Sequence, residues 1–178
     1  ENFYLRSMGL SMVWHCYEFV EFAKVSVIVQ ISACLMELLI LFDLDGTLTR
    51  TQKGYVPFNE AIRETFGVVG DIRSVIPDGN TDPQIVREIF AKANVEKEIA
   101  DDQWEQFAKN LWRSYSRALR GATTTVRALP GAPELLSLLS EKAELSQGVV
   151  TGNFEVTAQI KLEAAGLNSY LCRGGYAS

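Results

Sequence analysis

Two aspartates separated by one residue, Asp43 and Asp45, are the side chains of this 178-residue chain best placed to do chemistry. They directly follow residues 38–42, an apolar run typical of a parallel strand that is covered on both faces. Ligands of open α/β sheets bind at the carboxyl ends of such strands. Carboxylates at i and i+2 of a nearly extended segment point to the same side, so both can address one small group. One can attack phosphorus or carbon, while a protonated neighbour gives a proton to the leaving oxygen.

A purely structural interpretation is that the strand ends in an Asp-Gly turn, which the two carboxylates only cap. The run Asp43-Leu44-Asp45-Gly46-Thr47-Leu48-Thr49, however, resembles the first motif of the haloacid dehalogenase-like hydrolase superfamily. The resemblance implies that Asp43 is the nucleophile and Asp45 the general acid and base. Asp45 and Thr47 together resemble the phosphatase branch, because dehalogenases of the family generally lack the second aspartate.

A second apolar segment, residues 148–150, predicts a short buried strand followed by Thr151, Gly152 and Asn153. A helix is then predicted, ending at Gly166. Such a strand-to-helix turn aims backbone N–H groups and a helix N-terminus at the crevice, which suits a phosphate. The resemblance implies that the Thr151 hydroxyl hydrogen-bonds the phosphoryl group, and that Gly152 and Asn153 bind substrate.

Lys161, in the same predicted helix, is the cation that the resemblance implies for neutralising the phosphoryl group and the nucleophile. Many members place this lysine just before a proline, and no such Lys-Pro pair occurs here. The branch with a Thr-Gly-Asn second motif carries a similar lysine in this helix. A solvent-facing helix lysine is the alternative, and the sequence leaves both open.

The resemblance also implies a Mg²⁺ cofactor, with Asp43 and Asp45 as its ligands. Because Mg²⁺ prefers octahedral oxygen ligands and retains waters, a carboxylate, a backbone carbonyl and a phosphate oxygen are suitable partners. The further aspartates that complete this site in the family do not occur before Ser178. We therefore expect a C-terminally truncated fragment that is inactive by itself and only marginally folded, with only two clear core strands.

Residues 51–127 have helical periodicity and no strong strand signal. We predict a helix ending at Gly67, a second with Thr81 or Asp82 as its cap, and a third over residues 102–119 with Trp104, Trp112 and Tyr115 in its buried face. Helices inserted after the first catalytic loop resemble the helical cap of one large branch of the superfamily.

The loop before the second helix, Gly79-Asn80-Thr81-Asp82, resembles cap loops that face the catalytic aspartates, which makes Thr81 and Asp82 candidate substrate-binding residues. An ordinary turn followed by an N-cap explains the same residues equally well. Arg63, Arg73 and Arg87 are further candidates for an anionic substrate, although solvated helix faces account for them better.

The predicted fold class is α/β, with an incomplete Rossmann-like parallel sheet core and an inserted α-helical cap. The predicted core comprises residues 36–50 and 128–178, and the cap residues 51–127. Residues 1–35 follow no sustained period and form an atypical extension. Our hypothesis is that Met36 is the natural start and that this extension is not native; a real amphipathic appendage is the alternative.

The composition limits the class of protein. A net charge of −5 without a basic stripe argues against nucleic acid as the main partner. The three cysteines are scattered and odd in number, so they predict neither a disulfide framework nor a zinc site and favour a reducing, cytoplasmic compartment. Neither a signal peptide nor a membrane span is predicted, since polar residues interrupt the apolar stretch 25–42. The sequence does not indicate an oligomeric state.

These observations together predict a magnesium-dependent phosphatase that hydrolyses a small phosphorylated metabolite through an aspartyl-phosphate. A phosphomutase of the same superfamily uses the same aspartates and is the first alternative. A truncated, non-catalytic fragment that binds partners through its cap or its N-terminal extension is the second.

Overall fold

The computed structural model describes residues 25–32, 35–95, 98–171 and 173–177, with the backbone alone for 25–32 and 35–37. One 3-10 turn, η1, covers Ile72–Ser74. The strands and helices, in chain order, are β1 Val25–Ser32, β2 Leu35–Phe42, β3 Thr49–Gln52, α1 Tyr55–Phe66, α2 Asp82–Lys92, α3 Asp101–Arg120, β4 Thr125–Ala128, α4 Ala132–Ser140, β5 Leu145–Phe154, α5 Glu155–Ala164 and β6 Gly174–Ala177.

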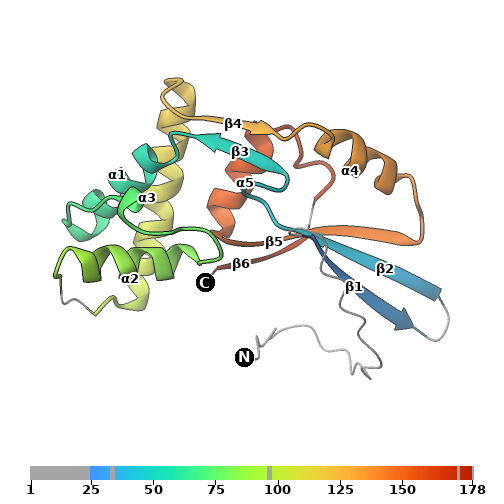
Figure 1. Ribbon diagram of the computed structural model, residues 1–178, viewed down its shortest axis with the longest axis horizontal. Helices are drawn as coiled ribbons and strands as arrows, with labels where there is room; N and C mark the ends of the chain where they lie inside the picture. The colour runs from blue at the N-terminus through green and yellow to red at the C-terminus, as the bar shows by residue number, and fades with distance from the viewer. Residues whose placement is uncertain (1–24, 33–34, 96–97, 172, 178) are drawn as a thin grey trace.

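The main sheet has the strand order β1-β2-β5-β6 (Figure 1). β1 runs antiparallel to β2, whereas β2, β5 and β6 are parallel, with Phe42 of β2 opposite Val149 of β5. This arrangement confirms the predicted α/β class with a parallel sheet. The prediction of only two core strands is wrong. The missed strands are β1, within a stretch without a sustained period, and the short β6, which begins with two glycines.

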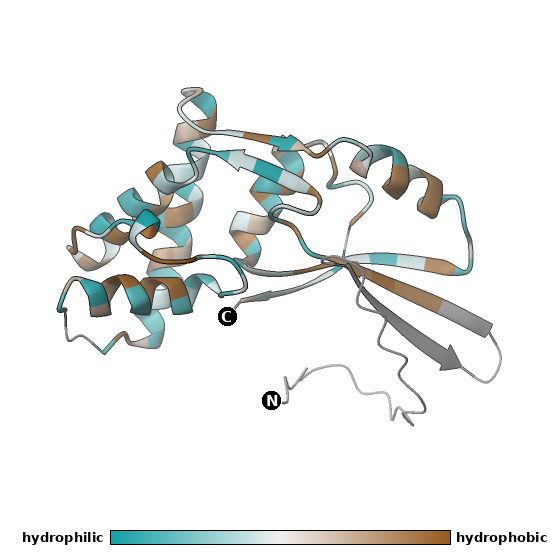
Figure 2. Cartoon of the chain, in the orientation of Figure 1, coloured by the Kyte–Doolittle hydropathy of each residue, from teal (hydrophilic) through white to brown (hydrophobic). Residues whose placement is uncertain are grey.

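The apolar core of the sheet lies on the side covered by α4 and α5. Ile40 and Phe42 of β2 and Val149 of β5 pack there against Leu136 of α4 and Leu162 of α5. Figure 2 shows the hydrophobic colour on the part of β2 that is not grey, and Leu38–Phe42 of this strand pair with β5. The apolar run therefore forms a strand in which Ile40 and Phe42 are buried and the three leucines are only partly buried. The polar residues that follow it emerge at the carboxyl edge of the sheet.

Helices α1, α2 and α3 lie together at one end of the molecule and are inserted between β3 and β4 (Figure 1). β3 and β4 pair antiparallel, with Thr49 opposite Ala128, and form a two-stranded ribbon that joins this helical insert to the sheet. The sequence did not predict these strands, because each has four residues and the two together carry only two apolar side chains, Val126 and Ala128. The domain boundaries predicted at 50/51 and 127/128 fall inside this ribbon and stay a prediction.

The three predicted helices of the insert are confirmed. α1 ends at Gly67, and the Thr81 side chain caps α2 by accepting a hydrogen bond from the backbone N–H of Gln84. One residue of α3 was predicted wrongly: Trp112 is 48% exposed. It lies just outside the buried stripe of α3, which includes Phe107, Leu111 and Tyr115. Among the described residues, no helix combines the length and apolarity needed to cross a bilayer.

Phe154 joins the sheet to the insert. It is the last residue of β5, and its ring lies 5.9 Å from that of Phe107 and 6.4 Å from that of Trp104. Val156 and Ile160 of α5 pack against the same aromatic cluster. The insert is therefore docked on the sheet through apolar contacts next to the second predicted motif.

Candidate active site

The first motif forms a tight turn at the carboxyl end of β2. The Leu44 carbonyl accepts hydrogen bonds from the backbone N–H groups of Leu48 and Thr49, at 3.0 and 2.9 Å. Gly46 has φ +78°, a left-handed conformation that glycine adopts at little cost. This turn directs the chain into β3 and holds Asp45 at the sheet edge, two residues after the half-buried Asp43.

Lys161 of α5 reaches this turn. Its Nζ donates hydrogen bonds to Asp45 Oδ2 and to Asn153 Oδ1, both at 2.7 Å. The Lys161 side chain is 6% exposed, whereas that of Asp45 is 43% exposed. The solvent-facing alternative for Lys161 is therefore wrong, while its binding of a phosphoryl group stays a prediction.

Asn153 links the two predicted motifs. Its side-chain amide donates to Asp45 Oδ2 at 2.8 Å and to the Thr151 hydroxyl at 2.6 Å. The structure thus brings Asp45, Thr151, Asn153 and Lys161 together at the carboxyl edge of the sheet, beside Asp43. We call these five residues the core face.

The charges of the core face are set by the Asp45–Lys161 pair. Burial raises the pKa of Asp45, but the charge and hydrogen bond of Lys161 outweigh it and hold that pKa below its usual value. Burial lowers the pKa of Lys161, but its interactions with Tyr115, Asp45 and Asp82 outweigh burial and raise that pKa well above that of an ordinary lysine. In this structure the pair therefore favours a charged Asp45, although a general acid requires the protonated form.

The loop before α2 packs directly on the second motif. A Cβ added to Gly152 would lie 2.3 Å from the carbonyl oxygen of Asn80 and 3.0 Å from the Cα of Thr81. The side chain of Thr81 forms a capping box with Gln84 instead of facing the core. Gly152 and Thr81 thus act in the contact between insert and sheet, and their predicted binding of substrate stays untested.

Asp82 is buried, at 6% exposure, and its Oδ2 accepts a hydrogen bond from the backbone N–H of Phe154 at 2.9 Å. Because Phe154 is the N-cap residue of α5, this carboxylate satisfies an N–H group at the start of a helix from the core. Burial raises the pKa of Asp82 to about 6, and the nearby charge of Lys161 offsets part of that effect. The sequence placed Asp82 near the site but did not reveal this partner.

Tyr115 of α3 is a site residue that sequence reasoning assigned only to the apolar core. Lys161 Nζ lies 5.7 Å from the centroid of its ring. The Tyr115 hydroxyl donates to the Gly54 carbonyl at 3.5 Å, and burial raises the pKa of this phenol to about 12. We call Asp82 and Tyr115 the insert face, since both bring groups from the helical insert toward Lys161.

The candidate donors for a magnesium ion are oxygen atoms of the first motif. Mg²⁺ takes one or two carboxylates and retains waters, so the Asp43 carboxylate and the Asp45 backbone carbonyl suit it. The Leu44 carbonyl, and not that of Asp45, accepts the hydrogen bonds that close this turn. Within the described ranges, no group of three or more His, Cys, Asp or Glu side chains forms a ready-made metal cluster. The residues present therefore fit a magnesium ion that shares its coordination with water and a phosphate.

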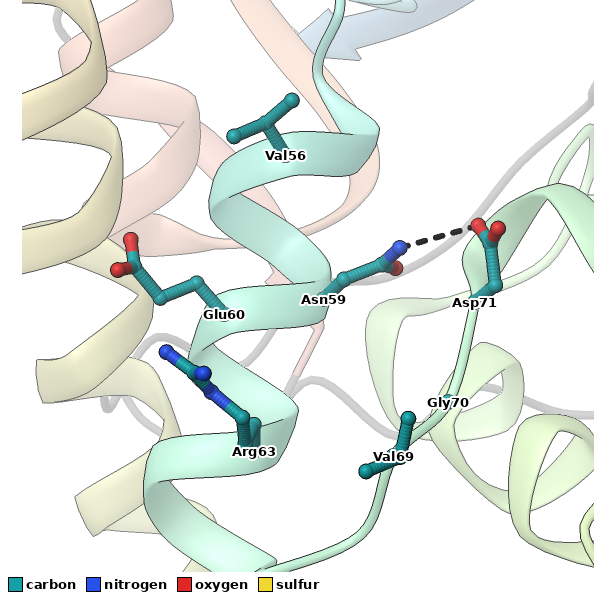
Figure 3. Close-up of a pocket in the computed structure, with 7 residues that line it drawn as sticks. All are labelled: Val56, Asn59, Glu60, Arg63, Val69, Gly70 and Asp71. Atoms are coloured by element: carbon teal, nitrogen blue, oxygen red, sulfur yellow. Dashed lines mark hydrogen bonds between the residues drawn. The ribbon is translucent and has the colours of Figure 1, made fainter.

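A separate cavity of about 480 Å³ lies on the insert, between α1 and residues 69–71 (Figure 3). Arg63 lines it, and Asn59 there donates a hydrogen bond to Asp71. Arg73 pairs with Asp71, and Arg87 lies over the ring of Trp104. Apart from Arg63, none of the residues predicted for the site lines this cavity, and it contains no residue of the core face.

The comparisons with known proteins agree with this fold. The sequence model of the haloacid dehalogenase-like hydrolases matches residues 38–176. The chain therefore belongs to the haloacid dehalogenase-like hydrolase family. No curated protein matched the chain.

The solved structures that share the fold include two with a TM-score of 0.50. A predicted phosphoglycolate phosphatase from Haemophilus somnus is 22% identical, with a TM-score of 0.50 over 76% of this chain and 60% of that one. A hydrolase from Pseudomonas syringae is 24% identical, with a TM-score of 0.50 over 75% of this chain and 58% of that one. The chain thus spans about 60% of the length of these structures.

Proposed function

We propose that the protein containing this chain is a magnesium-dependent phosphatase that hydrolyses a small phosphomonoester. The observation that carries the proposal is the buried Lys161, which contacts Asp45 at 2.7 Å beside the strand-end Asp43. A cation held between a carboxylate and an amide at the carboxyl edge of a parallel sheet suits a phosphoryl group, whose negative charge needs fixed positive partners.

Asp43 is the proposed nucleophile. Its Oδ forms a bond to phosphorus while the bond from phosphorus to the leaving oxygen breaks, which gives an aspartyl-phosphate. Lys161 and the Thr151 hydroxyl would hold the phosphoryl oxygens during this transfer. When bound by Asp43 and the Asp45 carbonyl, Mg²⁺ supplies further positive charge against these oxygens. Water then attacks the phosphorus atom, releases phosphate and restores the Asp43 carboxylate.

Asp45 is the proposed general acid and base, so it must take up a proton before the first step. The negative phosphoryl group attracts Lys161, and this weakens the pair that keeps the pKa of Asp45 low. Protonated Asp45 then gives its proton to the leaving alcohol. In the second step the carboxylate accepts a proton from the attacking water.

The direct test is hydrolysis of an aryl phosphate by the protein that contains this chain, with Mg²⁺ and after chelation. Hydrolysis that disappears with the metal and returns on its addition supports the proposal. A phosphomutase passes the phosphoryl group to a second hydroxyl, so product analysis with a phosphosugar separates the two activities. A cytoplasmic setting and a small phosphorylated metabolite as substrate remain parts of this proposal.

A further inference from the structure

We propose that Tyr115 is a positioning residue, whose ring holds the ammonium group of Lys161 against Asp45. The inference rests on the proposed function, because the position of Lys161 affects turnover only if the protein transfers phosphoryl groups. The helical insert, through Tyr115 of α3, would then help to position Lys161 of α5.

The surroundings of Lys161 carry the argument. An ammonium group has three N–H donors, and Lys161 uses two hydrogen bonds, to Asp45 and to Asn153. The ring of Tyr115 lies within the range of about 6 Å at which an aromatic face attracts a cation. Lys161 and Tyr115 are 5% and 4% exposed, and this attraction strengthens where water is excluded.

Tyr115 is itself fixed from its far end. Its hydroxyl donates to the Gly54 carbonyl, and a Cβ added to Gly54 would lie only 3.2 Å from this hydroxyl. Burial raises the pKa of this phenol to about 12, so Tyr115 is neutral near pH 7. It therefore attracts Lys161 through the face of its ring and not through a negative charge. The start of α1 and α3 together thus determine where the ring lies over Lys161.

A purely structural role is the alternative, since Tyr115 also belongs to the apolar core of the insert. Such a role predicts a loss of stability when the ring is removed, but no change at Lys161. The two interpretations therefore differ in what happens to the lysine, and the test must measure the lysine directly.

The experiment compares Tyr115→Leu with Tyr115→Phe, which keeps the ring. Phe90→Leu is the matched control, because Phe90 is a buried aromatic of the same apolar cluster that contacts Phe66. Reductive methylation followed by peptide mass spectrometry measures the accessibility of Lys161 without any turnover. Inhibition of aryl phosphate hydrolysis by inorganic phosphate measures the affinity of the site, and KM and kcat are recorded with it.

We expect Tyr115→Leu to increase the methylation rate of Lys161 and to weaken inhibition by phosphate about 3- to 10-fold, the scale of one cation–π contact. Tyr115→Phe should match the wild type in both measurements. Phe90→Leu should lower the unfolding temperature and leave both unchanged.

Unchanged methylation and inhibition in Tyr115→Leu would overturn the assignment. Equal effects in Tyr115→Phe would also overturn it, because the ring would then not be the active part. Equal effects in Phe90→Leu would show a general loss of packing and overturn it as well. If the wild type hydrolyses no aryl phosphate while Lys161 methylation responds as expected, the proposed function fails and the contact between Tyr115 and Lys161 stands.

Discussion

The core face and the insert face each bring a carboxylate toward Lys161, and the two carboxylates differ in charge. Asp45 contacts the lysine directly, its side chain is 43% exposed, and its pKa is lowered. Asp82 is 6% exposed, accepts a hydrogen bond from a backbone N–H, and its pKa is raised to about 6. Direct pairing thus keeps one carboxylate charged, while burial favours the neutral form of the other.

The two faces therefore have different expected roles: the core face in phosphoryl transfer, and the insert face in attaching the helices to the sheet. The core face offers a partly exposed carboxylate and a cation, which are the groups that a phosphoryl transfer needs. The insert face offers buried groups that attach the helices to the sheet and surround Lys161. We therefore expect substitutions on the core face to reduce turnover, and substitutions on the insert face to change stability and the placement of Lys161.

The largest effect is expected for Asp43→Asn. The amide keeps the shape of the side chain but cannot attack phosphorus, so turnover of an aryl phosphate should fall by at least about a thousandfold. Thermal unfolding of the variant serves as the control and should stay close to that of the wild type. Turnover within tenfold of the wild type would show that Asp43 is not the nucleophile.

Asp45→Asn should slow turnover by about a hundredfold, the scale of general acid–base catalysis. The reason is that an amide cannot give a proton to the leaving oxygen. Aryl phosphates with acidic leaving groups need this proton less and should lose less rate in the first chemical step. If the rate of that step fell equally for all leaving groups, Asp45 would not be the general acid.

Gly152→Ala tests the contact between the insert and the sheet. The new Cβ would overlap the Asn80 carbonyl, so we expect a loss of about 1–3 kcal/mol in the free energy of unfolding. Gly175→Ala is the matched control, since its Cβ would lie 3.7 Å from Val150 in ordinary contact. Denaturant unfolding measures both, and equal stability of the two variants would contradict the close packing at Gly152.

Asp82→Asn tests the insert face through pH. Since the folded pKa of about 6 lies above the ordinary 3.8, the folded state binds more protons and stability falls as pH rises between these values. The asparagine oxygen still accepts the Phe154 N–H and carries no charge. The variant should therefore be more stable than the wild type above pH 6, by up to about 3 kcal/mol, and should show no gain below about pH 4.

Unfolding midpoints measured from pH 4 to 8 provide the test. If Asp82→Asn were more stable than the wild type by the same amount at every pH, the titration of Asp82 would not be the cause and the prediction would be wrong. A variant that is less stable at high pH would show that the charged carboxylate is needed for docking.

The sequence predicted the parts of the fold that depend on local pattern. The apolar run before Asp43 predicts β2, and the helical spacing with Thr81 and Gly67 at the ends predicts α1 and α2. The strands β3 and β6 were missed because each has four residues and few apolar side chains. Pairing with a neighbouring strand determines such segments, and a single sequence does not show the neighbour.

For the candidate site too, the sequence predicted what depends on local residue patterns and missed what depends on contacts between distant segments. Both motifs and Lys161 were found by their residues, and the structure brings Asp45, Asn153 and Lys161 into contact. Tyr115 was recognised only as a buried aromatic, because helical periodicity shows that a face is buried but not what it contacts. The hydrogen bond from Phe154 to Asp82 likewise joins residues that no local pattern relates.

The most direct test of the central claim is detection of the aspartyl-phosphate. The protein that contains this chain would be mixed with an aryl phosphate and Mg²⁺, quenched in acid within one turnover, and digested for peptide mass spectrometry. We predict a phosphoryl group on Asp43 that hydroxylamine removes and that is absent from Asp43→Asn. Rapid hydrolysis with no phosphorylated peptide, or with the phosphoryl group on another residue, would contradict transfer through Asp43.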